Sequence, residues 1–119
     1  MRNANDAKKT GAIRAGLGEP YGSRLELVEA ELTDADSMER AIAGSTYVIH
    51  LASPVPFGEP KDEQELIRPA VQGTRAVLEA CRRARVRRVA YASSVAVIYN
   101  GLVKQPVYTE EHWSDVNAP

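Results

Sequence analysis

The sequence has little of several features that mark other protein classes. Cys81 is the only cysteine among 119 residues, which excludes an internal disulfide and a cysteine-rich zinc site. Aromatic residues make up only 6% of the chain, too few for a surface that stacks nucleic-acid bases. No apolar run approaches the roughly 18 residues that cross a bilayer, and the N-terminus lacks an apolar signal core. We therefore expect a cytoplasmic protein without a membrane partner.

The charge is balanced, with a formal net charge of −1. The basic run from Arg82 to Arg88 would favour nucleic-acid contact if taken alone. However, it follows a predicted helix, and cations are favourable at a helix C-terminus. A protein with this overall charge has no global field that attracts nucleic acid, so we expect no such partner.

The hydrophobic pattern predicts an α/β fold in a single domain spanning residues 1–119. Apolar or β-forming runs at 25–32, 46–52 and 87–94 predict three strands. Helical spacing, with capping residues before it, predicts helices at 5–16 and 35–43, and a third in two parts at 61–84. Strands that alternate with helices at this spacing form parallel sheets.

Two residues of the third predicted helix are unusual for a helix interior. Pro69 lacks a backbone N–H and should begin or kink a helix. Gly73 costs about 1 kcal/mol relative to alanine in such a position. Either the backbone approaches a strand or a cofactor closely at Gly73, or the glycine is a tolerated defect.

The strand predicted at 87–94 ends on two serines, Ser93 and Ser94. Ligands of open α/β sheets bind just beyond the carboxyl ends of parallel strands. The two hydroxyls are therefore either strand caps or groups that face a cofactor or substrate. His50, within the second strand, has no partner at metal-ligand spacing, so we expect it to be packed or hydrogen-bonded and predict no metal site.

Five short motifs follow one another in an order that resembles the extended short-chain dehydrogenase/reductases. The resemblance is greatest to the dihydroflavonol-reductase and cinnamoyl-CoA-reductase-like group within the wider epimerase/dehydratase superfamily. The motifs are Ala-Glu-Leu-Thr-Asp at 30–34, His-Leu-Ala-Ser-Pro at 50–54, Arg-Pro-Ala-Val-Gln-Gly-Thr at 68–74, Arg-Arg-Val-Ala-Tyr-Ala-Ser-Ser at 87–94, and Tyr-Thr-Glu-Glu-His-Trp-Ser-Asp at 108–115.

This resemblance implies a partial Rossmann-type fold with three parallel strands and crossover helices, without the substrate domain. It implies an NADP-dependent reductase, with NAD as the alternative cofactor, that transfers hydride to a small ketone or aldehyde. Epimerases and dehydratases on this scaffold often carry Asn where Ala70 stands, so Ala70 favours a reductase. A sugar-nucleotide epimerase/dehydratase and a non-catalytic remnant that binds a nucleotide or a protein are the alternatives.

The resemblance also assigns roles to individual residues. Ser94 matches the catalytic serine that hydrogen-bonds the substrate carbonyl, and Ser93 holds the strand end beside it. Phe57, in the loop after the second strand, is a candidate substrate contact. The residues expected to contact the cofactor are Arg2 and Lys9 at the 2′-phosphate, Glu31 and Leu32 at the adenine, and Leu51, Ala52 and Ser53 at the nicotinamide ribose.

Two motifs of the family do not occur in this sequence. The first is the Gly-x-x-Gly-x-x-Gly turn that holds the pyrophosphate; Gly16 and Gly18 follow a helix instead, and Tyr21 stands at the next glycine position. The second is Tyr-x-x-x-Lys, the general acid and its partner. We therefore expect a fragment of an enzyme, inactive alone, in which strand 25–32 pairs directly with strand 46–52.

Overall fold

The sheet consists of two parallel strands, β1 (Tyr47–His50) and β2 (Arg88–Tyr91). The computed structural model describes residues 3–54, 58, 60–99 and 106–115. In the register of the sheet, Tyr47 lies opposite Arg88 and His50 opposite Tyr91. The α/β class and these two predicted strands are confirmed, although each strand is shorter than expected.

The predicted strand at 25–32 is wrong, and so is its expected pairing with β1. In the described residues these positions form an extended segment that belongs to no sheet. The resemblance matches this segment to the third strand of the Rossmann order 3-2-1-4-5-6 and β1 to the fourth, and these two strands are not neighbours in that order. Without a neighbouring strand its backbone has no ladder to join. The alternation of apolar and polar residues, imperfect around Val28 and Glu29, does not show whether a neighbouring strand is present.

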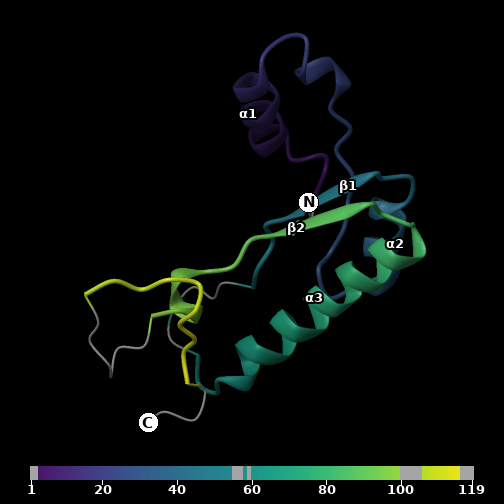
Figure 1. The fold of residues 1–119 in the computed structure, drawn as a ribbon. Coiled ribbons are helices and arrows are strands. Elements are labelled where there is room, and N and C mark those ends of the chain that lie inside the picture. Colours follow the sequence, from purple (N-terminus) through teal and green to yellow (C-terminus); the bar gives the residue numbers. More distant parts are fainter. Residues whose placement is uncertain (1–2, 55–57, 59, 100–105, 116–119) are drawn as a thin grey trace.

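Three helices and two short 3₁₀ turns complete the described structure (Figure 1). Helix α1 (Ala7–Leu17) is capped by Asp6, whose carboxylate accepts from the Lys9 backbone N–H, and Gly18 follows it with φ +62°. A left-handed residue after a helix is the conformation that glycine adopts most easily. Helix α1 buries none of its residues and contacts mainly the turn η1 (Gly22–Arg24). The predictions of a helix at 5–16 and at 35–43 are both confirmed.

Helices α2 (Ala35–Ile42) and α3 (Gln64–Arg83) pack against each other on one side of the sheet (Figure 1). Helix α3 is a single helix and does not divide into two parts, so that prediction is wrong. Pro69 lies inside α3, five residues after its first residue. There it removes one hydrogen bond near the start of the helix, and the rest of the apolar face still packs.

The core lies between these two helices and the sheet. Its buried members are Ile42 on α2 with Val77, Ala80 and Cys81 on α3. Val48 and Val89 pack against them from the sheet, because alternate side chains of a strand point to one face. The opposite face of β1 is exposed to solvent. Tyr47 and Ile49 on this face, and Leu51 just after the strand, have exposed fractions of 62%, 71% and 72%.

Gly73 allows the extended segment to pack closely on α3. An added Cβ at Gly73 would lie 2.8 Å from Cδ2 and 3.0 Å from Cδ1 of Leu32, with Cγ nearer still. Leu32 in turn packs on the buried core cluster. Close approach therefore explains this glycine, although the partner is the side chain of Leu32 in a segment outside the sheet and not a strand or a cofactor.

We predict that Gly73→Ala destabilises the protein. The overlap with Leu32 costs about 1–3 kcal/mol, which exceeds the roughly 1 kcal/mol that alanine gains in helix propensity. Urea unfolding should show a net loss of up to about 2 kcal/mol.

Two variants make this prediction specific. Gly11 lies in α1 with no atom near its would-be Cβ, so Gly11→Ala should cost no stability. In a Leu32→Ala background the space is open, and Gly73→Ala should then be neutral or stabilising. If Gly73→Ala lowers stability equally in both backgrounds, contact with Leu32 is not the cause.

Candidate functional site

Two segments far apart in the sequence meet in a cleft of about 240 Å³. Residues 30–33, from the extended segment, form one wall, and residues 52–54, which follow β1, form the other, with Met38 of α2 between them. Four of the residues predicted to bind the cofactor line this cleft: Glu31, Leu32, Ala52 and Ser53. The structure therefore brings together two motifs that the sequence separates by about twenty residues.

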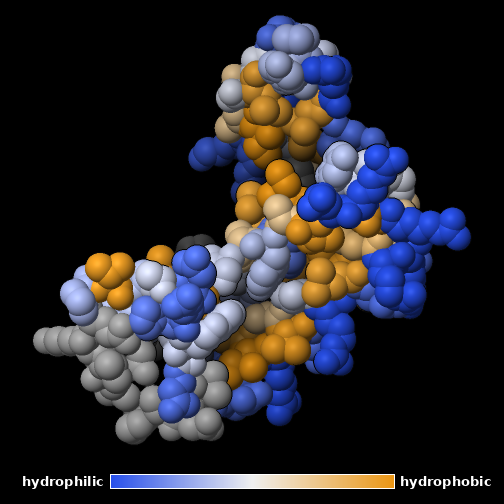
Figure 2. Space-filling view, viewed as in Figure 1, coloured by the Kyte–Doolittle hydropathy of each residue, from blue (hydrophilic) through white to orange (hydrophobic). Residues whose placement is uncertain are grey.

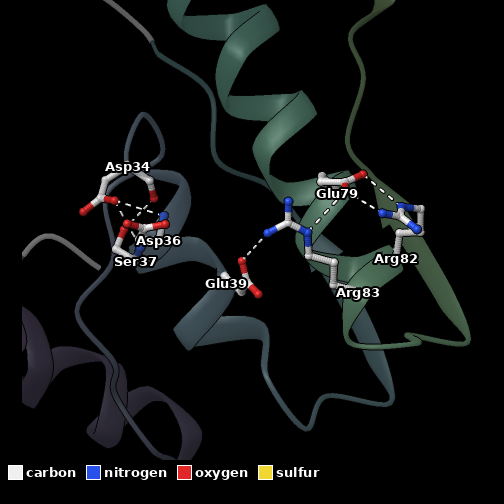
Figure 3. Close-up of polar contacts among 7 residues, drawn as sticks. All are labelled: Asp34, Asp36, Ser37, Glu39, Glu79, Arg82 and Arg83. Carbon is white, nitrogen blue, oxygen red and sulfur yellow. Dashed lines mark hydrogen bonds and ion pairs between the residues drawn. The ribbon is translucent and has the colours of Figure 1, made fainter.

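The first wall is held by the cap of α2. The Asp34 carboxylate accepts from the backbone N–H groups of Asp36 and Ser37, at 3.1 and 3.2 Å (Figure 3). Ser37 is 6% exposed, and its Oγ accepts from the Glu31 N–H at 3.0 Å. The same Oγ lies 2.9 Å from the Asp34 carbonyl oxygen and 3.2 Å from that of Glu31, either of which can accept its proton.

Ser37 thus positions one wall of the cleft, and it was not among the site residues predicted from the sequence. The signal was present as Asp34-x-x-Ser37 at a helix start, where a serine can reach back to the preceding backbone. Glu31 itself is turned toward its own chain, because its Oε1 accepts from the Leu32 N–H at 3.1 Å. The backbone of the wall is fixed at both residues.

Ser94 caps a turn just beyond β2. Its Oγ accepts from the Ala96 N–H at 3.2 Å, at the start of the 3₁₀ turn η2 (Val95–Val97). Ser114, later in the chain, also holds this turn, donating from its Oγ to the carbonyl of Ala96 at 2.7 Å or of Tyr99 at 3.0 Å. The capping role of Ser94 is therefore present. Accepting one bond leaves the hydroxyl proton available to donate elsewhere.

The serine turn and the cleft follow the same edge of the sheet. His50 lies opposite Tyr91 in the parallel register, so Ser53 and Ser94 each come three residues after paired positions. Ser93 and Ser94 are both exposed. The predicted strand at 87–94 included them, but β2 ends at Tyr91, before both serines. The carboxyl edge of a parallel sheet is where ligands of such folds bind.

Two other described residues among the predicted cofactor contacts, Lys9 and Leu51, do not line the cleft. Lys9, on α1, lies 3.6 Å from the Asp6 carboxylate and does not line the cleft. Leu51 lines a neighbouring cavity of about 310 Å³ with His50. Arg2 and Phe57 lie outside the described residues.

His50 is packed as predicted, but it is not hydrogen-bonded at Nε2. It is 4% exposed, and within the described residues Nε2 has no hydrogen-bond partner. Its ring lies 5.2 Å from the ring of Tyr91, its neighbour in the sheet. Burial lowers the pKa of His50 below its usual 6.5, because a charged imidazolium would lose its hydration there.

The part of the chain that the structure describes has neither a metal-binding cluster nor a membrane-spanning helix. No group of three His, Cys, Asp or Glu side chains there is placed to hold a metal ion. Nor does any described helix combine the length and apolar character needed to cross a membrane. Cys81 is buried in the core, where desolvation raises the pKa of its thiol.

The known proteins that this chain resembles are dehydrogenases and reductases. Residues 20–119 match the 3-beta hydroxysteroid dehydrogenase/isomerase family. The chain is 40% identical to an anthocyanidin reductase of Arabidopsis thaliana and 34% identical to a dihydroflavonol 4-reductase of Callistephus chinensis. Each alignment covers 98% of this chain but only 34% and 32% of the relative, so the chain spans about a third of their length.

A solved structure agrees with these relatives. The crystal structure of gox2253 superposes with a TM-score of 0.56 at 31% identity, over 63% of this chain and 22% of that one. Together these matches confirm the resemblance to dihydroflavonol-reductase-like members of the extended short-chain dehydrogenase/reductases.

We predict that acid destabilises the protein through His50. The unfolded chain takes up a proton near pH 6.5, whereas the buried imidazole resists it, so stability is full above that pH and falls as the pH drops below it. The urea midpoint should decrease between about pH 7 and pH 5.

His50→Gln should flatten this dependence, whereas His112→Gln, which changes the other histidine, should leave it intact. An unchanged slope in His50→Gln would show that other groups cause the acid effect.

Proposed function

Since the chain belongs to the 3-beta hydroxysteroid dehydrogenase/isomerase family, we propose that it carries part of the site of an NADP-dependent carbonyl reductase. The reaction is hydride transfer to a small ketone or aldehyde. The observation that carries the proposal is the cleft in which residues 30–33 meet residues 52–54, at the edge of the sheet that Ser94 also follows. The reductases among its relatives support this reading over an epimerase or dehydratase.

The cleft suits one end of a dinucleotide. Its volume of about 240 Å³ is below the roughly 300–1,000 Å³ of sites that enclose whole small ligands. The side chains of Leu32, Met38 and Pro54 offer apolar contact to a flat base, and Glu31 offers carboxylate lone pairs to its amino group. The resemblance places the adenine at Glu31 and Leu32, with Glu31 in the position usually held by aspartate, and the nicotinamide ribose at Ala52 and Ser53 across the cleft.

The pyrophosphate has no comparable holder in this sequence. Phosphates bind to glycine-rich turns at helix N-termini, and the Gly-x-x-Gly-x-x-Gly turn does not occur among these 119 residues. We therefore assign to this chain contacts to the adenosine of the cofactor and none to its pyrophosphate.

Ser94 would orient the substrate. Its Oγ is fixed by the bond from the Ala96 N–H, and its own O–H is free to donate to a carbonyl oxygen. Such a donor polarises the carbonyl and stabilises the negative charge that grows on its oxygen. When bound, the nicotinamide supplies the hydride to the carbonyl carbon. The proton for the resulting alkoxide needs a general acid, and no Tyr-x-x-x-Lys is present here to supply it.

We predict that the purified chain does not oxidise NADPH measurably above background with aldehyde or ketone substrates. Loss of a general acid alone costs about 10²- to 10⁴-fold in rate, and weak cofactor binding lowers turnover further. The absorbance of NADPH over time is the measurement. Robust turnover that disappears in Ser94→Ala would overturn the assignment of an incomplete site.

We also predict that adenosine 2′-monophosphate binds in the cleft. Its addition should shift the amide NMR signals of residues 30–33 and 52–54. Glu31→Ala should weaken binding about tenfold or more, as expected for loss of a hydrogen bond to a charged group.

Glu26→Ala is the matched control, since Glu26 lies on the same extended segment but does not line the cleft. If both variants weaken binding equally, or if the shifted signals lie elsewhere, the cleft is not the adenosine site.

A further inference from the structure

The turn η2, which follows Ser94, is held by hydrogen bonds and not by burial. None of its residues is buried, and Val95 is 76% exposed. The part of the molecule that contains this turn, at the left of Figure 2, shows mostly white and blue surface with small separate areas of orange. Without a buried apolar side chain, the backbone of the turn depends on its polar partners for a single conformation.

Two serines hold the backbone of Ala96 from its two ends. The Ala96 N–H donates to Ser94 Oγ at 3.2 Å, and the Ala96 carbonyl accepts from Ser114 Oγ at 2.7 Å. The N–H groups that follow in the turn donate to the carbonyls of Ser94 and Val95, which leaves the Ala96 carbonyl to Ser114. Because both soft dihedral angles of Ala96 lie between its N–H and its carbonyl, a partner at each end restricts both angles.

Ser114 is itself fixed in place. Its backbone N–H donates at 2.8 Å to the carbonyl of the last residue of η2. Just before it, His112 forms a turn with Thr109, whose N–H donates to His112 Nδ1 at 3.0 Å. The ring of Tyr108 lies 5.3 Å from the ring of Tyr99, which brings this segment to the end of η2. The Ser114 hydroxyl is therefore presented to the turn by a segment with contacts of its own.

The direction of the Ser94 hydroxyl depends on the place of the Ala96 N–H, because Ser94 Oγ accepts from it. We propose that Ser114 is a positioning residue for Ser94. By holding the Ala96 carbonyl, it keeps the Ala96 N–H aimed at Ser94 Oγ and so selects one rotamer of Ser94. The inference rests on the proposed function, in which this rotamer presents the hydroxyl proton to a substrate carbonyl. A group that must meet a substrate is most precise when supporting hydrogen bonds lock its rotamer.

The test measures the Ser94 side chain by NMR in the full chain. A single rotamer gives Hα–Hβ couplings at the limiting values of a staggered side chain, whereas free rotation averages them toward intermediate values. In Ser114→Ala the Ser94 couplings should become averaged. The Ala96 amide should also exchange with water roughly two- to tenfold faster, as expected for the loss of about one hydrogen bond. The backbone contact of residue 114 remains in this variant and keeps the segment in place.

Two further variants make the result specific. Ser114→Thr, which keeps the hydroxyl, should restore the couplings of the unmodified chain. Ser23→Ala is the matched control, because Ser23 Oγ also donates to a backbone carbonyl, that of Pro20 at 2.8 Å, in a different turn. If Ser114→Ala leaves the Ser94 couplings unchanged, or if Ser23→Ala changes them equally, Ser114 does not position Ser94 and the proposal is wrong.

A small ketone separates this inference from the proposed function. Cyclohexanone in excess should shift the Ser94 signals of the unmodified chain, and should shift them much less in Ser114→Ala. Equal shifts in the two proteins would overturn the positioning role of Ser114. If cyclohexanone shifts no Ser94 signal in either protein, the substrate role of Ser94 in the proposed function is wrong, and the couplings alone decide whether Ser114 holds its rotamer.

Discussion

The contact between Leu32 and Gly73 connects the parts of this small protein. The segment before α2 belongs to no sheet, so no ladder of backbone hydrogen bonds fixes its path. One side chain of the segment, Leu32, enters the space left by the missing Cβ of Gly73 on α3 and packs there on the core, while the Ser37 hydroxyl holds the adjacent Glu31 N–H. The adjacent residues of that segment form a wall of the cleft. The close packing at a helix glycine therefore helps to hold one wall of the cleft in place.

Polar contacts complete this arrangement at both ends of α2. At its start, Asp34 and Ser37 satisfy backbone groups of the helix and of Glu31. Toward its end, the Glu39 carboxylate accepts from Arg83 of α3 at 2.7 Å (Figure 3). The Glu39–Arg83 pair is about half exposed on both sides, so its contribution to stability is small, and it serves mainly to orient α2 on α3. The apolar cluster supplies most of the free energy that holds the two helices together.

Much of this structure could be predicted from local signals. The caps Asp6 and Asp34, the apolar spacing from Val71 to Cys81 and the β-forming run around Val48 each determine an element from adjacent residues alone. The segment at 25–32 could not be predicted in this way, because a strand exists only if another strand lies beside it. Pro69 was misjudged for a related reason: the packing of the whole helix outweighed the loss of one hydrogen bond. At the candidate site, the motifs made Glu31 and Ser53 candidate cofactor contacts, but that they line one cleft, and that Ser37 holds its wall, depends on the fold.

The isolation of α1 has a consequence for any ligand group that it would carry. The helix buries no residue and contacts mainly the turn that follows it, so little tertiary structure opposes its opening. Eleven-residue helices are marginal in water on their own. A phosphate held by Lys9 would therefore have to order the helix as it binds, and its affinity would be reduced by the fraction of time that the helix is unformed. In this protein, recognition of the 2′-phosphate and folding of α1 would be one coupled equilibrium.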